Sequence, residues 1–137
     1  ITDNDQADGL FPQDPFWGPE TYIGGEQPFD PIFFGFDQYN IGAEERTKLQ
    51  DIASYLGDNP NARILVEGYC DWKGTPAYNK SLGDRRATSV KDYLVDLGVN
   101  NNRIEILSIG DEMATPDADP TTAGLERKAK LIVRRDS

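Results

Sequence analysis

The sequence predicts an α/β two-layer sandwich: a mixed parallel and antiparallel sheet with its helices packed on one face, in the order β-α-β-α-β-β. Two amphipathic helical segments alternate with short β-branched or aromatic segments along the chain. Two strand–helix–strand units favour parallel pairing with right-handed crossovers, and a final strand adds in the antiparallel sense. The hydrophobic content of 37% in 137 residues suits one packed core.

The first strand–helix pair occupies residues 31–56. Residues 31–36 (PIFFGF) form an aromatic, strand-like run. Residues 43–56 are expected to form a helix that ends at Gly57. Its apolar side chains recur at i, i+3, i+4 and i+7 and make one stripe: Leu49, Ile52, Ala53 and Leu56.

A second strand and a long helix follow. Residues 62–68 (ARILVEG) read as a strand with an apolar centre. Thr75 is placed as the N-cap of a helix that runs to about Leu97. Gly83 interrupts the helical pattern, which indicates either a kink or a break between two helices.

Two further strands close the domain. Residues 103–109 (RIEILSI) alternate with a period of two, and residues 128–134 (KAKLIVR) form the last strand. The acidic segment 110–122, which contains two prolines, is predicted to be a loop.

Residues 1–30 differ in composition from residues 31–137, which form the predicted domain. They carry seven acidic and no basic residues, and so supply −7 of the net charge of −10. Their prolines and glycines favour an extended arm or linker. They also hold many aromatic residues for a solvated tether, so we expect part of 11–30 to lie across the domain, with a free tether as the alternative: Phe11, Phe16, Trp17, Tyr22 and Phe29.

The composition excludes several functional classes. A pI of about 4.3 disfavours nucleic acid as a partner. The chain has no histidine, which removes histidine-based catalysis and histidine-ligated metals, and Cys70 is the only cysteine. Asp37 and Asp71 could imitate a glycosidase pair, but the sequence offers no histidine, no activated nucleophile and no cofactor loop to support catalysis. We therefore expect a binding module without a cofactor or metal, and no enzyme.

Two clusters could carry binding chemistry. Residues 68–75 (GYCDWKGT) lie where a strand ends and a helix begins, and residues 79–87 (NKSLGDRRA) lie on that helix. Ligands of α/β folds favour such crevices at the carboxyl ends of strands. Asp71 and Arg86 could converge there and hold the ammonium and carboxylate groups of a zwitterion. The alternative is a plain salt bridge between the two residues.

The segment 66–94 resembles the OmpA-like peptidoglycan-binding domains, and among them most closely the peptidoglycan-associated lipoproteins (Pal). Four pieces match at fixed spacing between residues 67 and 87: E-G-x-x-D-x-x-G-T, Y-N, L-G and R-A. The similarity extends over about residues 31–135. It implies the fold of the OmpA C-terminal domain.

The resemblance also implies a function. Domains of this family bind the peptide stem of peptidoglycan non-covalently, chiefly through the zwitterionic end of diaminopimelate. The family's binding Asp and Arg fall on Asp71 and Arg86, and its supporting Asn and Leu fall on Asn79 and Leu82. The loop after the first strand is expected to offer backbone N–H groups, with one aromatic ring as a wall: Gly35, Phe36 and Asp37.

The same resemblance implies a cellular setting. The domain would tether an outer membrane or a lipoprotein complex to the wall from the periplasm, with the membrane reached only through a lipid anchor. The alternative is a protein-interaction module of a Tol-Pal-like system with a TolB-like periplasmic partner. In either case, no cofactor is implied.

The chain departs from the family pattern at a few positions. Tyr69 and Cys70 replace the usual His-Thr or His-Ala, and Cys70 is expected to be a packed side chain. Trp72 is expected either to cover the ligand or to pack on the arm. Glu126 replaces an Asn of the family, and Arg127 either contributes to the site or pairs with a nearby acid.

Overall fold

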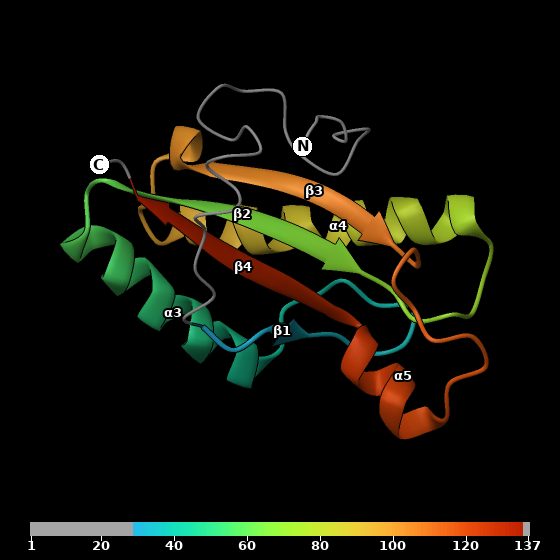
Figure 1. Ribbon diagram of the computed structural model, residues 1–137. Coiled ribbons are helices and arrows are strands. Elements are labelled where there is room, and N and C mark those ends of the chain that lie inside the picture. Colours follow the sequence, from blue (N-terminus) through green and yellow to red (C-terminus); the bar gives the residue numbers. More distant parts are fainter. Residues whose placement is uncertain (1–28, 136–137) are drawn as a thin grey trace.

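The structure, a computed structural model, describes residues 29–135 (Figure 1). The predicted arm, residues 1–30, therefore lies almost wholly outside the described part. The elements follow one another as β1 (Ile32–Phe33), α3 (Ala43–Asp58), β2 (Ala62–Tyr69), α4 (Pro76–Asp96), the 3₁₀ turn η3 (Asn101–Arg103), β3 (Ile104–Gly110), α5 (Pro120–Glu126) and β4 (Lys128–Arg135).

The predicted two-layer sandwich with a mixed sheet is confirmed. The strand order is β1-β4-β2-β3. Strands β2 and β3 are parallel, whereas β4 runs antiparallel to both of its neighbours, β1 and β2. The last strand thus lies inside the sheet, and the long helices α3 and α4 pack on one side of it (Figure 1).

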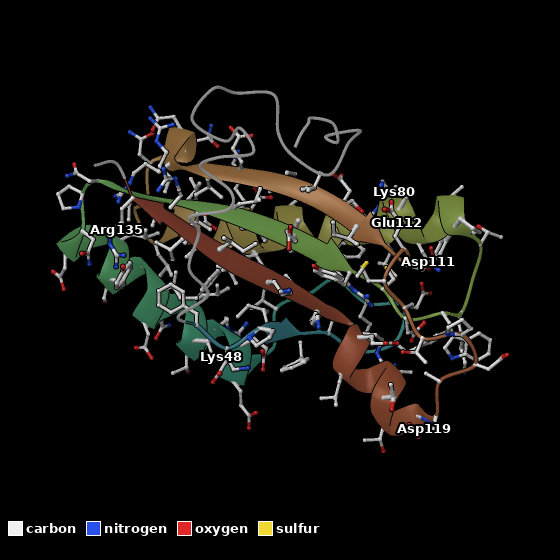
Figure 2. The ribbon with its side chains drawn as sticks, viewed as in Figure 1. Lys48, Lys80, Asp111, Glu112, Asp119 and Arg135 are labelled. Carbon is white, nitrogen blue, oxygen red and sulfur yellow. The ribbon has the colours of Figure 1, made fainter. Side chains whose placement is uncertain are left out.

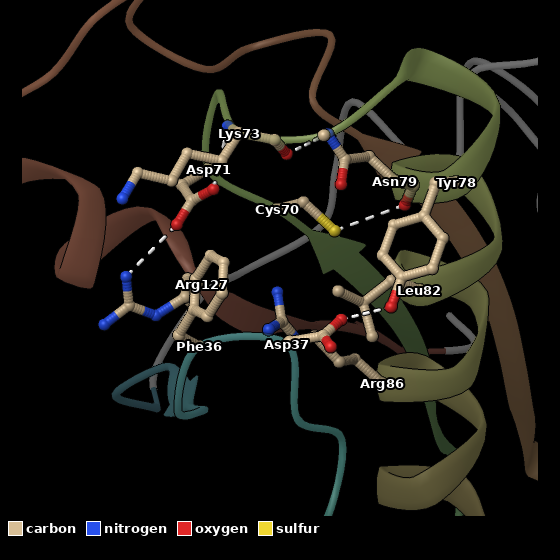
Figure 3. A pocket seen from close by; sticks show the side chains of 11 residues that line it. Phe36, Asp37, Cys70, Asp71, Lys73, Tyr78, Asn79, Leu82, Arg86 and Arg127 are labelled. Atoms are coloured by element: carbon tan, nitrogen blue, oxygen red, sulfur yellow. Dashed lines mark hydrogen bonds and ion pairs between the residues drawn. The ribbon is translucent and has the colours of Figure 1, made fainter.

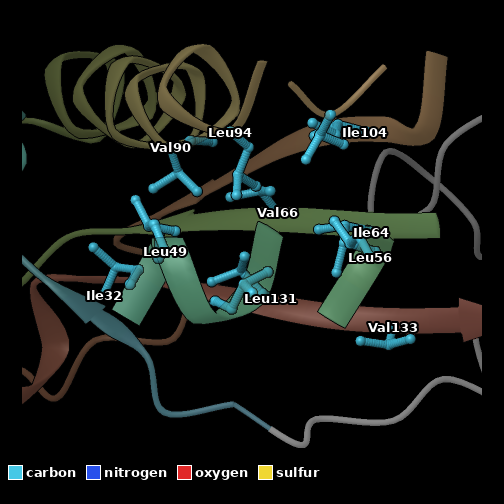
Figure 4. Packing of buried hydrophobic residues seen from close by; sticks show 14 of the residues in the cluster. Ile32, Leu49, Leu56, Ile64, Val66, Val90, Leu94, Ile104, Leu131 and Val133 are labelled. Atoms are coloured by element: carbon cyan, nitrogen blue, oxygen red, sulfur yellow. The ribbon is translucent and has the colours of Figure 1, made fainter. Parts of the chain in front are cut away.

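The core lies between this helical layer and the sheet (Figure 4). The stripe predicted on α3 is buried at Leu49, Ile52 and Leu56. Because side chains alternate along a strand, every second residue of β2 and β4 enters the same core. The fully or almost fully buried members from α4 and the strands are Ile32, Ala62, Ile64, Val66, Ala87, Val90, Leu94, Ile104, Ala129, Leu131 and Val133.

Gly83 does not interrupt α4, which continues unbroken from Pro76 to Asp96. It instead marks the closest approach of α4 to β2. A methyl group added to Gly68 would lie 1.8 Å from the carbonyl oxygen of Gly83, and one added to Gly83 would lie 2.5 Å from Ser108 Oγ. The paired glycines let the helix backbone rest on the strand where the strand ends.

The prediction of a loop over 110–122 is wrong at its C-terminal end, where α5 begins at Pro120. Asp119 caps this helix, since its Oδ1 accepts a hydrogen bond from Thr122 N at 2.7 Å. Seven residues are too few to display an apolar period, so only the cap and the proline signalled the helix. The helix ends at Glu126, which places Arg127 just before β4.

The first strand is shorter than the predicted 31–36. Its pairing with β4 extends by one backbone bond, from Phe34 N to Arg127 O at 2.9 Å. The chain then turns, since Gln38 N donates to Gly35 O at 3.1 Å and Asp37 adopts a positive φ of 57°. This turn points the loop after β1 toward the end of β2.

Phe29 is the one predicted arm aromatic that lies within residues 29–135. Its ring meets Tyr55 of α3 edge-on, with 5.2 Å between ring centroids, and it packs against the core. The other four aromatic residues of the arm lie outside the described residues.

Candidate functional site

A pocket lies where β2 ends, between the start of α4 and the loop after β1 (Figure 3). Its empty volume, which includes space open to solvent, is about 320 Å³. Six of the seven predicted site residues line it: Phe36, Asp37, Asp71, Asn79, Leu82 and Arg86. Gly35 does not line it and contributes a carbonyl behind it. The structure thus gathers these residues, and their role in binding stays a prediction.

Arg86 forms the inner wall and is 1% exposed. Its guanidinium donates to three backbone carbonyls, those of Gln38 at 2.8 Å, Tyr69 at 2.9 Å and Gly35 at 3.1 Å. These bonds join the loop after β1 to the end of β2. Burial lowers the pKa of Arg86 from its usual 12.5, while the nearby Cys70 and Asp71 oppose that shift.

Asp71 does not form the salt bridge with Arg86 that was considered as an alternative. Within residues 29–135 its ion-pair partner is Arg127, with Nη1 to Oδ2 at 3.1 Å, and its other oxygen accepts from Lys73 N at 3.0 Å. Asp71 is 4% exposed, and both oxygens of its carboxylate are fixed by these contacts. Arg127 therefore pairs with an acid, which is one of its two predicted roles. It also lines the pocket.

Asn79 is 2% exposed, and its side-chain hydrogen bonds explain this burial. Its Nδ2 donates to Lys73 O at 2.7 Å and to Asp111 Oδ2 at 2.9 Å. It thereby ties the connection between β2 and α4 to the segment after β3. Leu82, one turn further along α4, adds the apolar wall.

The rim of the pocket is aromatic and charged. Phe36 is 57% exposed, and Lys73 Nζ lies 5.4 Å from its ring centroid. Tyr78 donates a hydrogen bond to Asp37 Oδ1 across the mouth, joining α4 to the loop after β1 (Figure 3). That bond raises the pKa of Tyr78 above its usual 10.

Cys70 is 3% exposed, and its Sγ donates to Asn79 O at 3.2 Å. Burial, the dominant cause, raises the pKa of this thiol to about 11. It is thus a protonated, packed side chain at neutral pH, as predicted.

A thiol reagent tests this state of Cys70. In the folded protein at pH 7.5, alkylation is expected to be slow, because the thiolate is the reactive form and little of it exists far below pH 11. The rate should rise with pH toward that value and should become fast at pH 7.5 in denaturant. Rapid labelling of the folded protein at neutral pH would contradict the prediction.

Tyr69 and Trp72 both find partners away from the pocket. The hydroxyl of Tyr69 donates to Glu67 Oε1 at 2.9 Å, and burial raises its pKa. Trp72 Nε1 donates to Ala118 O at 3.1 Å, which packs the indole against the segment before α5. The arm lies almost wholly outside the described residues, so covering the ligand and packing on the arm both stay predictions for Trp72.

Three lining residues were not singled out in the sequence analysis: Lys73 and Gly74, which belong to the cluster 68–75, and Tyr78. All lie in or beside the matched motif, but none carried a separate chemical signal. The pocket is lined by three cationic residues, Lys73, Arg86 and Arg127, and by two acidic ones, Asp37 and Asp71. It therefore presents charges of both signs, although the chain as a whole is strongly acidic. Such a lining suits a ligand that carries both charges.

Sequence comparisons identify proteins similar to this chain. The profile of the OmpA family matches residues 33–129. The peptidoglycan-associated lipoprotein of Haemophilus influenzae is 44% identical over 87 residues, 64% of this chain and 57% of that protein. The one from Rhizobium meliloti is 36% identical over 115 residues, 80% of this chain and 65% of that protein. The chain thus spans about three fifths of the length of these relatives.

Solved structures with a similar fold are known as well. The peptidoglycan-associated lipoprotein from Burkholderia pseudomallei superposes with a TM-score of 0.73 at 33% identity, covering 76% of this chain and 89% of that one. The C-terminal domain of Helicobacter pylori MotB superposes with a TM-score of 0.69 at 21% identity, over 80% of this chain and 87% of that one. The second likeness concerns the fold alone.

Proposed function

The chain belongs to the OmpA family, and from this membership we propose that its pocket binds the peptide stem of peptidoglycan non-covalently. The observation that carries the proposal is the placement of Arg86 and Asp71 in one small pocket, each fixed by other hydrogen bonds. The names of the relatives, peptidoglycan-associated lipoproteins, indicate the same ligand class. The diaminopimelate residue is the part of the stem whose free end suits such a pocket.

Arg86 is the proposed partner of the carboxylate. A guanidinium has five N–H groups, and three of those of Arg86 are bound to carbonyls. The other two are the groups that a carboxylate would accept from in the pocket. Because the three fixed bonds already order the side chain, little rotamer entropy is lost on binding. Each charged hydrogen bond contributes about 1.5–3 kcal/mol.

Asp71 is the proposed partner of the ammonium group. An ionised carboxylate offers about four acceptor sites, and Lys73 N and Arg127 Nη1 occupy one each. Asp71 can therefore accept from the ligand without giving up its own support.

We propose binding without turnover. Cys70 lines the pocket as a protonated thiol that donates a hydrogen bond to a carbonyl. A protonated thiol is a poor nucleophile. A binding module needs only fixed complementary charges, and these the pocket provides.

The proposed role of this binding is to tether an outer membrane, or a lipoprotein complex, to the wall from the periplasm. No helix within residues 29–135 is long and apolar enough to cross a bilayer. The lipid anchor is proposed from the likeness to lipoproteins.

A protein-interaction role for the same surface is the second candidate. Three of the exposed large hydrophobic residues lie in the loop after β1 and in the first turn of α4: Phe36, Tyr39 and Tyr78. Exposed aromatic side chains are typical of protein contact surfaces. A TolB-like periplasmic protein would compete there with the peptide stem.

Calorimetric titration with a diaminopimelate muropeptide tests the proposed function. Asp71→Asn keeps the shape of the side chain and removes its charge, so affinity is expected to fall about 10- to 100-fold. Asp84→Asn removes the same charge from an exposed residue of α4 outside the pocket and should leave affinity unchanged. A lysine-type stem, which lacks the second carboxylate, should bind more weakly.

Two outcomes of the titration would contradict the proposal. If the parent protein binds neither stem, the protein-interaction role takes its place. If Asp71→Asn binds as tightly as the parent, the ammonium group is held elsewhere.

A further inference from the structure

A second groove lies close to the pocket, between the connection from β2 to α4 and the segment from β3 to α5. Asp111 and Asp119 mark the two ends of that segment in Figure 2. The empty volume of the groove, which includes space open to solvent, is about 630 Å³. We call it the Trp72 groove and define it by its lining residues: Trp72, Asp111, Ala114, Pro116 and Asp117.

The indole of Trp72 is half-buried and held in place. Its Nε1 donates to Ala118 O at 3.1 Å, and Lys73 Nζ lies 5.9 Å from its ring centroid. The hydrogen bond uses the single donor of the side chain, so the indole offers the groove an apolar ring surface. Because the ring is already ordered, a ligand that stacks on it costs little side-chain entropy.

The segment from β3 to α5 is also fixed by hydrogen bonds. Two backbone turns shape it, with Ala114 N donating to Asp111 O at 3.0 Å and Ala118 N to Thr115 O at 3.2 Å. The carboxylate of Glu126 in α5 accepts from Thr115 N at 3.1 Å and from Thr115 Oγ1 at 2.8 Å. Glu126, which replaces an Asn of the family, thus holds this wall of the groove on α5.

A hydrogen bond joins the Trp72 groove to the pocket. Asn79 lines the pocket, and its Nδ2 donates to Oδ2 of Asp111, which lines the groove, at 2.9 Å. Asp71, the proposed partner of the ammonium group, directly precedes Trp72, so the Cα atoms of the two residues are about 3.8 Å apart. A ligand whose zwitterion lies in the pocket therefore has its next groups within reach of the indole.

We propose that the Trp72 groove binds a sugar ring of the glycan strand to which the peptide stem is attached. This inference rests on the proposed function, because it concerns the same ligand. Diaminopimelate is the third residue of the stem counted from the sugar, and three extended residues span about 10 Å. A pyranose ring has a C–H face that stacks on an indole, and its hydroxyl groups find acceptors in Asp111 and Asp117.

A cationic ligand suits the groove less well than a neutral sugar. Lys73 Nζ already lies near the ring of Trp72, so a second cation on the indole would meet a like charge. One oxygen of Asp111 already accepts from Asn79. Sugar hydroxyls bring no charge and need one lone pair from each carboxylate, which Asp111 can still provide.

Calorimetric titration with two matched ligands tests the proposal. One is the free stem peptide that contains diaminopimelate, and the other is the same stem carrying its disaccharide. The protein is expected to bind the second about 10-fold more tightly. In Trp72→Ala the two affinities should become equal. Met113→Ala removes an exposed side chain of the same segment that does not line the groove, so the 10-fold difference should remain.

Nuclear Overhauser effects (NOEs) give a direct readout of the stacking. The ring protons of Trp72 are expected to show NOEs to C–H protons of the sugar in the complex with the disaccharide-bearing stem. The chain has two tryptophans, and the signals of Trp72 are those that disappear in Trp72→Ala.

Three results would overturn the proposal while leaving the proposed function intact. The first is equal binding of the two ligands by the parent protein. The second is a gain from the disaccharide that persists in Trp72→Ala, which would place the sugar elsewhere. The third is a shift of the Trp72 signals by tetralysine and not by the disaccharide-bearing stem, which would assign the groove to a cationic partner. If the parent protein binds neither ligand, the proposed function fails and this inference fails with it.

Discussion

Gly68→Ala is expected to destabilise the protein by about 3 kcal/mol or more, at or beyond the upper end for overpacked cores. The added methyl group would lie 1.8 Å from the carbonyl oxygen of Gly83. The methyl group is fixed to the backbone of β2 and the carbonyl belongs to the backbone of α4, so neither can rotate away and α4 must move away from β2 as a whole. Because α4 carries Asn79, Leu82 and Arg86, the same shift should open the pocket. Urea denaturation followed by circular dichroism measures the loss.

Gly57→Ala is the matched control for this substitution. Gly57 lies in the last turn of α3, and a methyl group there meets nothing within 4 Å. Alanine has the higher helix propensity, so stability should stay the same or rise by less than about 1 kcal/mol. Equal destabilisation by the two substitutions would show that the contact between Gly68 and Gly83 is not tight.

Arg86→Met is expected to destabilise the protein by about 3 kcal/mol or more and to abolish binding of the stem peptide. Methionine fills part of the volume but removes the guanidinium donor from the carbonyls of Gly35, Gln38 and Tyr69. Of these, Gly35 O keeps its bond from Gln38 N. Each buried unpaired acceptor costs about 1–3 kcal/mol. Urea denaturation measures the stability, and titration at low temperature measures the binding of the molecules that remain folded.

Arg85→Met is the control, since it changes the same residue type one position earlier. Arg85 is exposed, and its guanidinium lies 5.5 Å from the Tyr39 ring, much as that of Arg86 lies 5.3 Å from the Phe34 ring. Exposed contacts of this kind contribute about 0.5–1 kcal/mol. A similar loss of stability in both variants would contradict a special role for the three carbonyl bonds.

Most of the architecture could be predicted because helices and strands repeat with different periods. The stripe on α3 and the alternation in β3 each identified an element and its buried face. The position of β4 between β1 and β2 could not be predicted, because local patterns carry no information on which strands pair. Gly83 misled for a related reason: its explanation lies in a strand fifteen residues earlier, at Gly68.

The candidate site was predictable in its members and less so in its bonds. The motif located Asp71 and Arg86 in one crevice, and the structure places both in one pocket. The choice of Arg127 as the partner of Asp71 depends on how α5 ends, and that helix was missed. Arg86 donates to carbonyls of the loop backbone, which any residue type can supply. These contacts therefore could not be predicted from the sequence.

The interior position of β4 has a consequence for how the protein folds. Arg127 donates to Phe34 O across 93 residues of sequence, and Phe34 N returns a bond to Arg127 O. Contacts this distant slow folding, because a long loop must close before they form. The pocket therefore exists only once both ends of the domain have met. A stem peptide that binds the pocket would therefore bind only folded molecules. By mass action, binding to the wall would then stabilise the folded state of the domain.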